Sequence, residues 1–543
     1  MAADCWSCIF LFGRLLWQDC PTRKDHATGC EVILLQPAAH QERNTMAEPS
    51  KGLPMTSKWD PDKLQREIAE LNALESRPFG ARAVGYIQRT GPGLLQSAMT
   101  LGAGSAAASV MAGASFGYKL LWVQPAAMFL GICMLAALGN VVLTTGERPY
   151  RAFGRELSRI LAFLWALGTV VASVIWHFPQ YGLAASSARD LAELFGATVS
   201  AAGPSGASAF TPAGYAVSCG IGAFILCLSI FTTWNYGSGS RGIKLFEWFL
   251  RGLIGLVILS FSIVVLANLN RIEWTELGKG IIGWYGIPET EGSLTLVLGM
   301  LGAAVGINMT FLYPYSLLAK GWGEHHKTLS RWDLVMSMFL PFVLVTSLVM
   351  VGMAVTGVYN PASEIVREGM KPLDASKALT GILGENLGRI IFDLGLIGMT
   401  CGAISTHMVV CGFTLCEMFG LEYTVWRYRL FTLAPAIGIL GVATTTPMWL
   451  PIVASAICFT MLPVAYLLFF IMNNRRSYIG DAVGKGLGRA AFNLILMVAI
   501  LMATIGAGIQ VKQRVIDKLP ELVGSKPAAP VPPMPRTPPA SNR

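Results

Sequence analysis

The feature that constrains this chain most is a series of apolar runs, each about 20 residues long, between Gly91 and Gly508. A helix of about 20 apolar residues crosses the hydrocarbon core of a bilayer, so each run is long enough to span a membrane. The composition agrees, because 53% of the 543 residues are hydrophobic and only 13% are charged. The sequence therefore predicts an all-α integral membrane protein whose surroundings are the lipid bilayer.

Two of these runs contain small, flexible residues at mid-membrane depth. The first carries Gly-Ala-Gly-Ser at 102–105, and the sixth carries Gly-Ile-Asn-Met-Thr at 306–310, followed by Pro314. Such residues can simply let two helices pack closely. Because the two segments lie five spans apart, they fit better to two five-helix inverted repeats that each begin with a broken helix. This reading predicts a transporter whose substrate binds between the breaks.

Eleven runs define the predicted membrane region. The expected spans are 91–112, 118–143, 159–182, 213–235, 245–268, 294–320, 333–357, 388–418, 427–445, 449–472 and 489–510. We divide the chain into a polar leader at 1–88, an eleven-helix transporter domain at 89–510 and a Pro-rich tail at 511–543, which we expect to be disordered. Within the leader, residues 60–75 predict a short amphipathic helix, and residues 1–45 are either an extension or a mispredicted start.

Lysine and arginine are concentrated in alternate loops between the spans. Cytoplasmic loops carry an excess of these residues, so we expect the N-terminus to be cytoplasmic and the protein to be multi-pass in the plasma (inner) membrane. The net charge of +9 comes from these loops rather than from a binding stripe, which argues against nucleic acid as a partner. We find no phosphate loop, nucleophile elbow or paired catalytic carboxylates, so we expect neither an enzyme nor a bound cofactor.

The sequence resembles the Nramp (natural resistance-associated macrophage protein) family of divalent metal transporters over roughly residues 80–510. The segment GPGLLQSAMTLGAGSAAASVMAGASFGYKLLWV at 91–123 resembles the first helix of that family without a gap. Further similarities lie at Thr145-Gly146, Arg241…Glu247, Leu312-Tyr313…Ser316, Arg427…Pro435 and Leu462-Pro463. The resemblance implies the LeuT-type fold, with a 5+5 inverted repeat, discontinuous helices 1 and 6, and an added eleventh helix.

The metal-site positions of the family are occupied here by different residues. The family has an Asp-Pro-Gly-Asn run in helix 1, and Gly102 and Ser105 stand at its aspartate and asparagine positions. It has a Met-Pro-His run in helix 6, where Asn308 and Thr310 replace the methionine and the histidine. The backbone carbonyl that the family uses three residues upstream falls on Val305.

The resemblance therefore implies a substrate site without a charged side chain. Its candidate residues are Gly102, Ser105, Val305, Asn308, Thr310 and, in the tenth span, Ser455. For a metal ion, the candidate ligands are Ser105, Asn308 and the Val305 carbonyl. These hard, neutral oxygens suit a cation such as magnesium better than manganese or iron. A neutral break of this kind also fits an organic solute such as an amino acid.

The proton route of the family is altered as well, which argues against proton coupling. Trp176 and Pro179 stand where its third helix has acidic residues. The sequence Asp-Leu-Ala-Glu at 190–193 copies the missing pattern, but it follows the predicted span, so we interpret it as part of a loop. His177 is interpreted as a buried structural residue.

Other ionisable residues lie in or near the spans. We expect Glu247 and Arg251 to form a local ion pair, because they are four residues apart on one helix. His407 is interpreted as a packing residue, and Asp393 must face protein or water. Three functions follow: a divalent cation carrier, a carrier of a small organic solute, or a non-transporting sensor on the same scaffold. The family resemblance favours the first.

Overall fold

The computed structural model describes residues 61–512, apart from 203–207, 237–239, 357, 361–363, 367–369, 371–373, 377–383 and 445. Our expectations for residues 1–60 and for the tail at 513–543 lie outside the described residues. The amphipathic helix predicted at 60–75 is confirmed as α2 (Pro61–Glu75).

The first half of the bundle contains helices at the first five predicted spans. Its elements are α3 (Phe79–Ile87), α4 (Pro92–Thr100), α5 (Ala103–Phe116), α6 (Val123–Thr145), α7 (Pro149–Glu156), α8 (Arg159–Leu194), β1 (Ser200–Ala202), β2 (Ser208–Phe210), α9 (Pro212–Tyr236) and α10 (Ser240–Ala267). The two strands form a short antiparallel hairpin between α8 and α9 that the sequence did not predict. The connection to the second half holds η1 (Leu269–Arg271) and α11 (Trp274–Ile281).

The second half contains helices at the other six predicted spans. Its elements are α12 (Ser293–Ala304), α13 (Ile307–Ala319), η2 (Glu324–His326), α14 (Lys327–Asp333), η3 (Leu334–Phe339), α15 (Leu340–Val355), α17 (Glu385–Met418), α18 (Val425–Thr432), η4 (Ala434–Ala443), α19 (Trp449–Phe459), α20 (Leu462–Asn474), α21 (Arg476–Ile479), η5 (Gly480–Val483) and α22 (Gly486–Val511).

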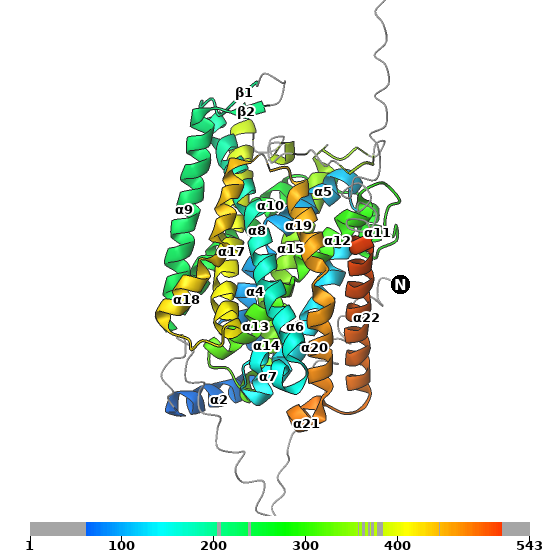
Figure 1. The fold of residues 1–543 in the computed structure, drawn as a ribbon. Coiled ribbons are helices and arrows are strands. Elements are labelled where there is room, and N and C mark those ends of the chain that lie inside the picture. Colours follow the sequence, from blue (N-terminus) through cyan, green and yellow to red (C-terminus); the bar gives the residue numbers. More distant parts are fainter. Residues whose placement is uncertain are drawn as a thin grey trace, which may run out of the picture.

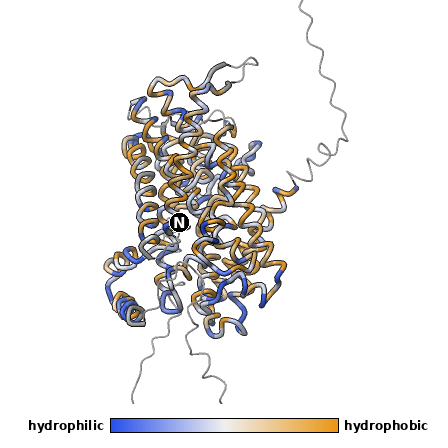
Figure 2. Tube along the Cα trace, turned by 60° about the vertical axis from the view of Figure 1, so that its left-hand side comes forward, coloured by the Kyte–Doolittle hydropathy of each residue, from blue (hydrophilic) through white to orange (hydrophobic). Residues whose placement is uncertain are grey.

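The helices run roughly side by side between two ends, which we name by their elements. The β1–β2 hairpin marks the hairpin end, and α2 marks the α2 end (Figure 1). Seven helices among the described residues are long and apolar enough to cross a membrane, or eight when α19 and α20 count as one bent span. Hydrophobic residues cover the helices along their length (Figure 2). Large apolar side chains such as Trp248, 74% exposed, point outward, as expected for a surface that faces lipid.

Both predicted helix breaks are present, in the first and sixth spans. The first separates α4 from α5 at Leu101 and Gly102, and the second separates α12 from α13 at Val305 and Gly306. The breaks are shorter than the sequence suggested, because Ser105, Asn308 and Thr310 already lie in the first turn of the second half-helix. All four half-helices are almost entirely buried in the bundle.

Three spans differ from the prediction. Helix α8 continues to Leu194, so residues 190–193 belong to the helix, and their interpretation as a loop was wrong. The ninth span changes from α-helix to a 3-10 helix near Pro435, where the chain lacks a backbone donor. The tenth span bends by 43° between α19 and α20, next to Pro463.

The start of α4 is tied to three other helices at the α2 end. The buried carboxylate of Asp333 accepts hydrogen bonds from the backbone N–H groups of Gly91, at 3.1 Å, and Gly93, at 2.6 Å. Glu247 pairs with Lys320 at 2.9 Å rather than with Arg251, so the predicted local pair was wrong. Arg251 instead donates to the carbonyl of Thr90 at 3.2 Å. Contacts with other helices therefore determine the partners of Glu247 and Arg251, although the two residues are four apart on one helix.

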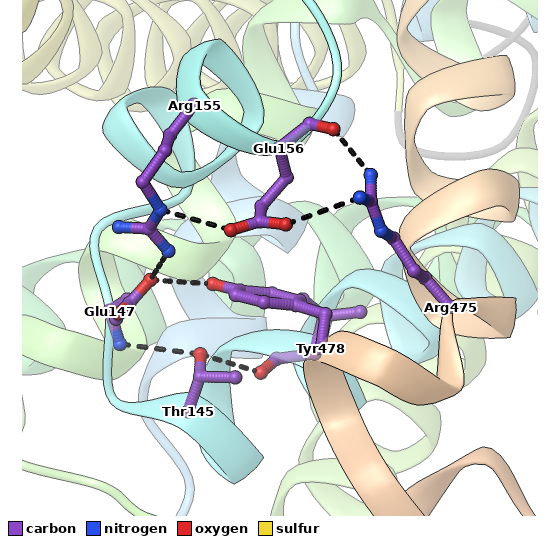
Figure 3. Close-up of polar contacts among 7 residues, drawn as sticks. Thr145, Glu147, Arg155, Glu156, Arg475 and Tyr478 are labelled. Carbon is purple, nitrogen blue, oxygen red and sulfur yellow. Dashed lines mark hydrogen bonds and ion pairs between the residues drawn. The ribbon is translucent and has the colours of Figure 1, made fainter.

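A second polar cluster joins α7 to α21 at the same end (Figure 3). Arg155 lies between Glu147 and Glu156, with N···O distances of 2.8 and 3.0 Å. Tyr478 donates to Glu147 at 2.8 Å, and Arg475 reaches the Glu156 carboxylate at 3.5 Å. The cluster therefore holds α7, from the first half of the bundle, against α21, from the second half, at the α2 end.

Candidate functional site

Two glycines let neighbouring side chains approach the first break closely. A Cβ atom on Gly102 would lie 2.7 Å from the side-chain nitrogen of Gln180 and 2.8 Å from the Cβ of Ala403. A Cβ on Gly104 would lie 2.1 Å from the ring of Trp176. A larger residue at either position, including an aspartate at position 102, would therefore require these neighbours to shift.

Backbone polar groups at the first break form hydrogen bonds with two side chains, Gln180 from α8 and Ser105 from α5. The backbone N–H of Ala103 donates to the side-chain oxygen of Gln180 at 3.0 Å. The hydroxyl of Ser105 donates to the carbonyl of Thr100 and, at 3.2 Å, to that of Gly102. Ser105 thus bridges the two half-helices, and its oxygen lone pairs remain available to a cation.

The second break is organised by Asn308. Its side-chain oxygen accepts from the backbone N–H of Met309 at 3.2 Å, and its amide nitrogen lies 2.9 Å from Nδ1 of His407. The N–H of Gly306 points to the sulfur of Met309 at 3.4 Å. With Nδ1 of His407 accepting from the amide, the neutral ring carries its proton on Nε2, which is then a hydrogen-bond donor.

Between the breaks lies a cavity of about 10 Å³, measured as the space open to the centre of a water molecule. That is room for about one water molecule or one ion. The residues that line it are Met99, Thr100, Gly102, Gly104, Ser105, Trp176, Gln180, Gly302, Ala303, Gly306, Asn308, Met309 and His407.

Three of the six predicted site residues line this cavity: Gly102, Ser105 and Asn308. The other three lie beside it. The Val305 side chain packs against Gly131, and the Thr310 hydroxyl accepts from the ring nitrogen of Trp165 at 2.8 Å. The Ser455 hydroxyl is buried, has no hydrogen-bond partner in the described ranges, and lies 2.9 Å from the Cβ position of Gly104.

Sequence reasoning missed two kinds of donor at the cavity. Met99 and Met309 bring thioethers, and His407 brings an imidazole from α17. Met309 had no signal of its own, because the comparison with the family placed Asn308 at the methionine position. His407 was visible as an ionisable residue within a span, and packing was the simpler interpretation.

The cavity carries no acidic side chain. Among the residues that the structure describes, no three His, Cys, Asp or Glu side chains gather in a group able to hold a metal ion. Negative potential at the cavity comes instead from the carbonyl ends of α4 and α12, which terminate at the breaks. Discontinuous membrane helices hold cations with such half-helix C-termini and unwound carbonyls.

Broken first and sixth spans around a central cavity define a multi-pass membrane transporter of the inverted-repeat type. Residues 93–509 match the family model described as natural resistance-associated macrophage protein-like, Nramp. This match covers more than half of the chain, so the chain belongs to the Nramp family. The prediction of a transporter rather than an enzyme agrees with this membership.

Individual relatives support the assignment over most of the chain. The divalent metal cation transporter MntH of Acidiphilium cryptum is 23% identical over 437 residues, which cover 77% of this chain and 91% of the relative. The MntH of Deinococcus radiodurans is 23% identical over 421 residues, covering 75% and 86%.

A solved structure of the Eremococcus coleocola manganese transporter, in complex with an aromatic bis-isothiourea substituted compound, has the same fold. It superposes with a TM-score of 0.61 at 14% identity, covering 87% of this chain and 94% of that one. The predicted LeuT-type fold, with discontinuous helices 1 and 6 and an eleventh helix, is confirmed.

Proposed function

We propose that this protein moves divalent metal cations across the membrane by alternating access, with the ion bound between the two helix breaks. The observation that carries the proposal is the cavity itself, because it is ion-sized and lies where two broken helices meet. The relatives named MntH, which are divalent metal cation transporters, support the same substrate class. An amino acid is far larger than the enclosed space in this conformation.

The donors at the cavity favour a softer divalent ion than the sequence suggested. Asn308 offers an amide oxygen, His407 offers the Nδ1 lone pair once the Asn308 amide turns away from it, and the methionines offer sulfur. Imidazole and thioether ligands favour ions such as iron over magnesium. We therefore place manganese or iron ahead of magnesium, with Ser105 and the Val305 carbonyl as further oxygen ligands once α4 or α12 shifts.

The experiment is uptake by purified protein in liposomes, with manganese, iron, magnesium and a panel of amino acids offered separately. We expect saturable uptake of manganese or iron, and a loss of about tenfold or more in affinity for His407→Ala, as for loss of one ligand or its close support. The matched control is His325→Ala, which changes an exposed histidine at the α2 end. Flux of an amino acid without flux of any divalent ion would overturn the proposal.

We further propose that the α2 end faces the cytoplasm and that the protein lies in the plasma (inner) membrane, with the leader at 1–88 and the tail at 511–543 outside the eleven-helix domain. The excess of lysine and arginine in the loops at that end supports this orientation. Protease protection of a tag placed before α2, in vesicles of known sidedness, tests it. Digestion from the outside of intact cells would contradict it.

A further inference from the structure

A buried ion pair joins α8 to α17 near the hairpin end. The Asp190 carboxylate is bound by the guanidinium of Arg389 through two contacts, 2.5 Å from Nη2 and 3.1 Å from Nε. Asp190 is only 5% exposed. A carboxylate in a bidentate contact with arginine has its negative charge fully compensated. Arg389 therefore has no second charge to offer to another acid.

A second acid, Asp393, lies one turn further along α17. It is completely buried, and neither of its carboxylate oxygens has a hydrogen-bond partner among the described residues. Asp393 follows Arg389 by four residues on α17, so both side chains lie on the same side of the helix, and its carboxyl group interacts with that of Asp190. Two ionised carboxylates are both acceptors and repel each other, whereas a protonated carboxyl can donate to an ionised one.

The other charged groups that the structure describes in this region do not balance Asp393. On α8, Arg189 donates to Ser218 at 2.6 Å, and Glu193 is exposed and accepts from Ser200 at 3.0 Å. Helix α9 and the 3-10 helix η4, which pack beside α17 and α8, contain no Asp, Glu, Lys, Arg or His. The charged residues of α10 all lie in its first half, at 241–251, whereas Phe261 in its second half meets α17 beside this site.

Within the described part of the chain, the local count is thus two carboxyl groups and one guanidinium, one positive charge fewer than the carboxyl groups. An unpaired carboxylate in a membrane bundle costs several kcal/mol or takes up a proton. On α8, between Gln180 at the cavity and Asp190, the buried hydroxyl of Tyr181 also has no hydrogen-bond partner among the residues that the structure describes. Polar groups of this kind inside a span are characteristic of ion and proton paths.

We propose that Asp190 and Asp393 form a proton-binding pair, in which Asp393 carries one proton and donates it in a hydrogen bond to the ionised Asp190. When α8 and α17 separate at the hairpin end, water reaches the pair, the proton passes from the Asp393 carboxyl to water, and Arg389 shares both carboxylates. The pair lies 14 residues along α17 from His407, about 21 Å, so it is a site separate from the cavity. Its use in driving metal transport rests on the function proposed above.

Proton binding can be tested without any metal, by infrared spectroscopy of the purified protein between acid and alkaline pH. We expect the wild type to show the carbonyl band of a buried carboxylic acid at neutral pH and Asp393→Asn to lack it. Asp190→Asn should lose the band too, because Arg389 then pairs with an ionised Asp393. Glu193→Gln, a matched change on the exposed side of α8, should keep it.

Two results would overturn the proposal: a wild-type spectrum without such a band, or a band that survives in Asp393→Asn. If Asp393→Asn fails to fold, the Asp190→Asn spectrum alone still decides, since persistence of the band there contradicts the shared proton. A site filled by sodium instead would show a sodium-dependent shift of a carboxylate band and no acid band.

Coupling is tested separately in liposomes. Metal uptake by the wild type should change by up to about tenfold per pH unit, the limit for one linked proton, and uptake by Asp393→Asn should change much less. Wild-type uptake that does not depend on pH would show that the pair is not coupled to transport. Absence of any metal uptake would refute the proposed function and leave the infrared result standing.

Discussion

Replacing Asp333 by asparagine should loosen the first half-helix of the broken pair. The carboxylate of Asp333 is fully buried and accepts from the N–H groups of both Gly91 and Gly93, which open α4. A helix leaves its first N–H groups without partners, and a negative charge there also complements the helix dipole. Asparagine keeps the shape, but it offers only one acceptor oxygen and no charge.

The magnitude follows from these two contacts. Hydrogen bonds to a charged group contribute about 1.5–3 kcal/mol each, so the substitution loses one of them and weakens the other, roughly 2–4 kcal/mol in all. Each 1.4 kcal/mol is a factor of ten in an equilibrium constant, so local opening of α4 should become roughly 30- to 700-fold more frequent. The approach of the two segments is close, since a Cβ added at Gly93 would lie 2.6 Å from the backbone carbonyl oxygen of Asp333.

Amide hydrogen exchange measured by mass spectrometry on peptides covering α4 reads this opening directly. We expect faster exchange in α4 for Asp333→Asn and unchanged exchange in α22, which lies away from the break. The matched control is Asp481→Asn, since that side chain is 82% exposed and forms surface pairs only. If α4 exchanges within about threefold of the wild type, the two hydrogen bonds do not hold the half-helix and the reasoning is refuted.

Two further substitutions test the packing of the bundle. Gly104→Ala should lower the free energy of unfolding by about 1–3 kcal/mol, because the rigid ring of Trp176 occupies the space of the new methyl group. Gly220→Ala, which meets nothing within 4 Å, should leave the thermal midpoint unchanged or raise it, and equal midpoints for both variants would contradict the clash. Glu417→Gln should lower the free energy of unfolding, measured by thermal unfolding, by about 1–3 kcal/mol. This loss is smaller than for a fully buried ion pair, because Arg151, one of the two arginine partners of Glu417, is half exposed. A loss below about 0.5 kcal/mol would show that this pair contributes little.

Much of the architecture could be predicted from the sequence because it depends on local properties. The length of each apolar run determines that it spans a membrane, whatever its neighbours are. The small residues at 102–105 and 306–310 located both breaks to within a few residues. Motifs carried by consecutive residues, such as the run at 91–123, were enough to indicate the family.

The end of α8 shows where local reasoning fails. Hydropathy falls before Asp190, so the span was predicted to end at residue 182. The helix continues because Arg389, almost 200 residues later, compensates the buried charge of Asp190. A polar residue can remain inside the bundle when another helix supplies its partner, and that partner is not visible in the local sequence.

The sequence by itself determined that the chain crosses the membrane many times and breaks two helices at its centre. Only the tertiary structure decided which side chains meet, joining Asn308 to His407 at the centre and Asp190 to Arg389 near the hairpin end. The reason is physical. Run length and residue size act within one helix, whereas contacts between helices depend on how each one is rotated and how deeply it is placed against its neighbours. The donors of the cavity and the buried acid pair belong to this second kind of information.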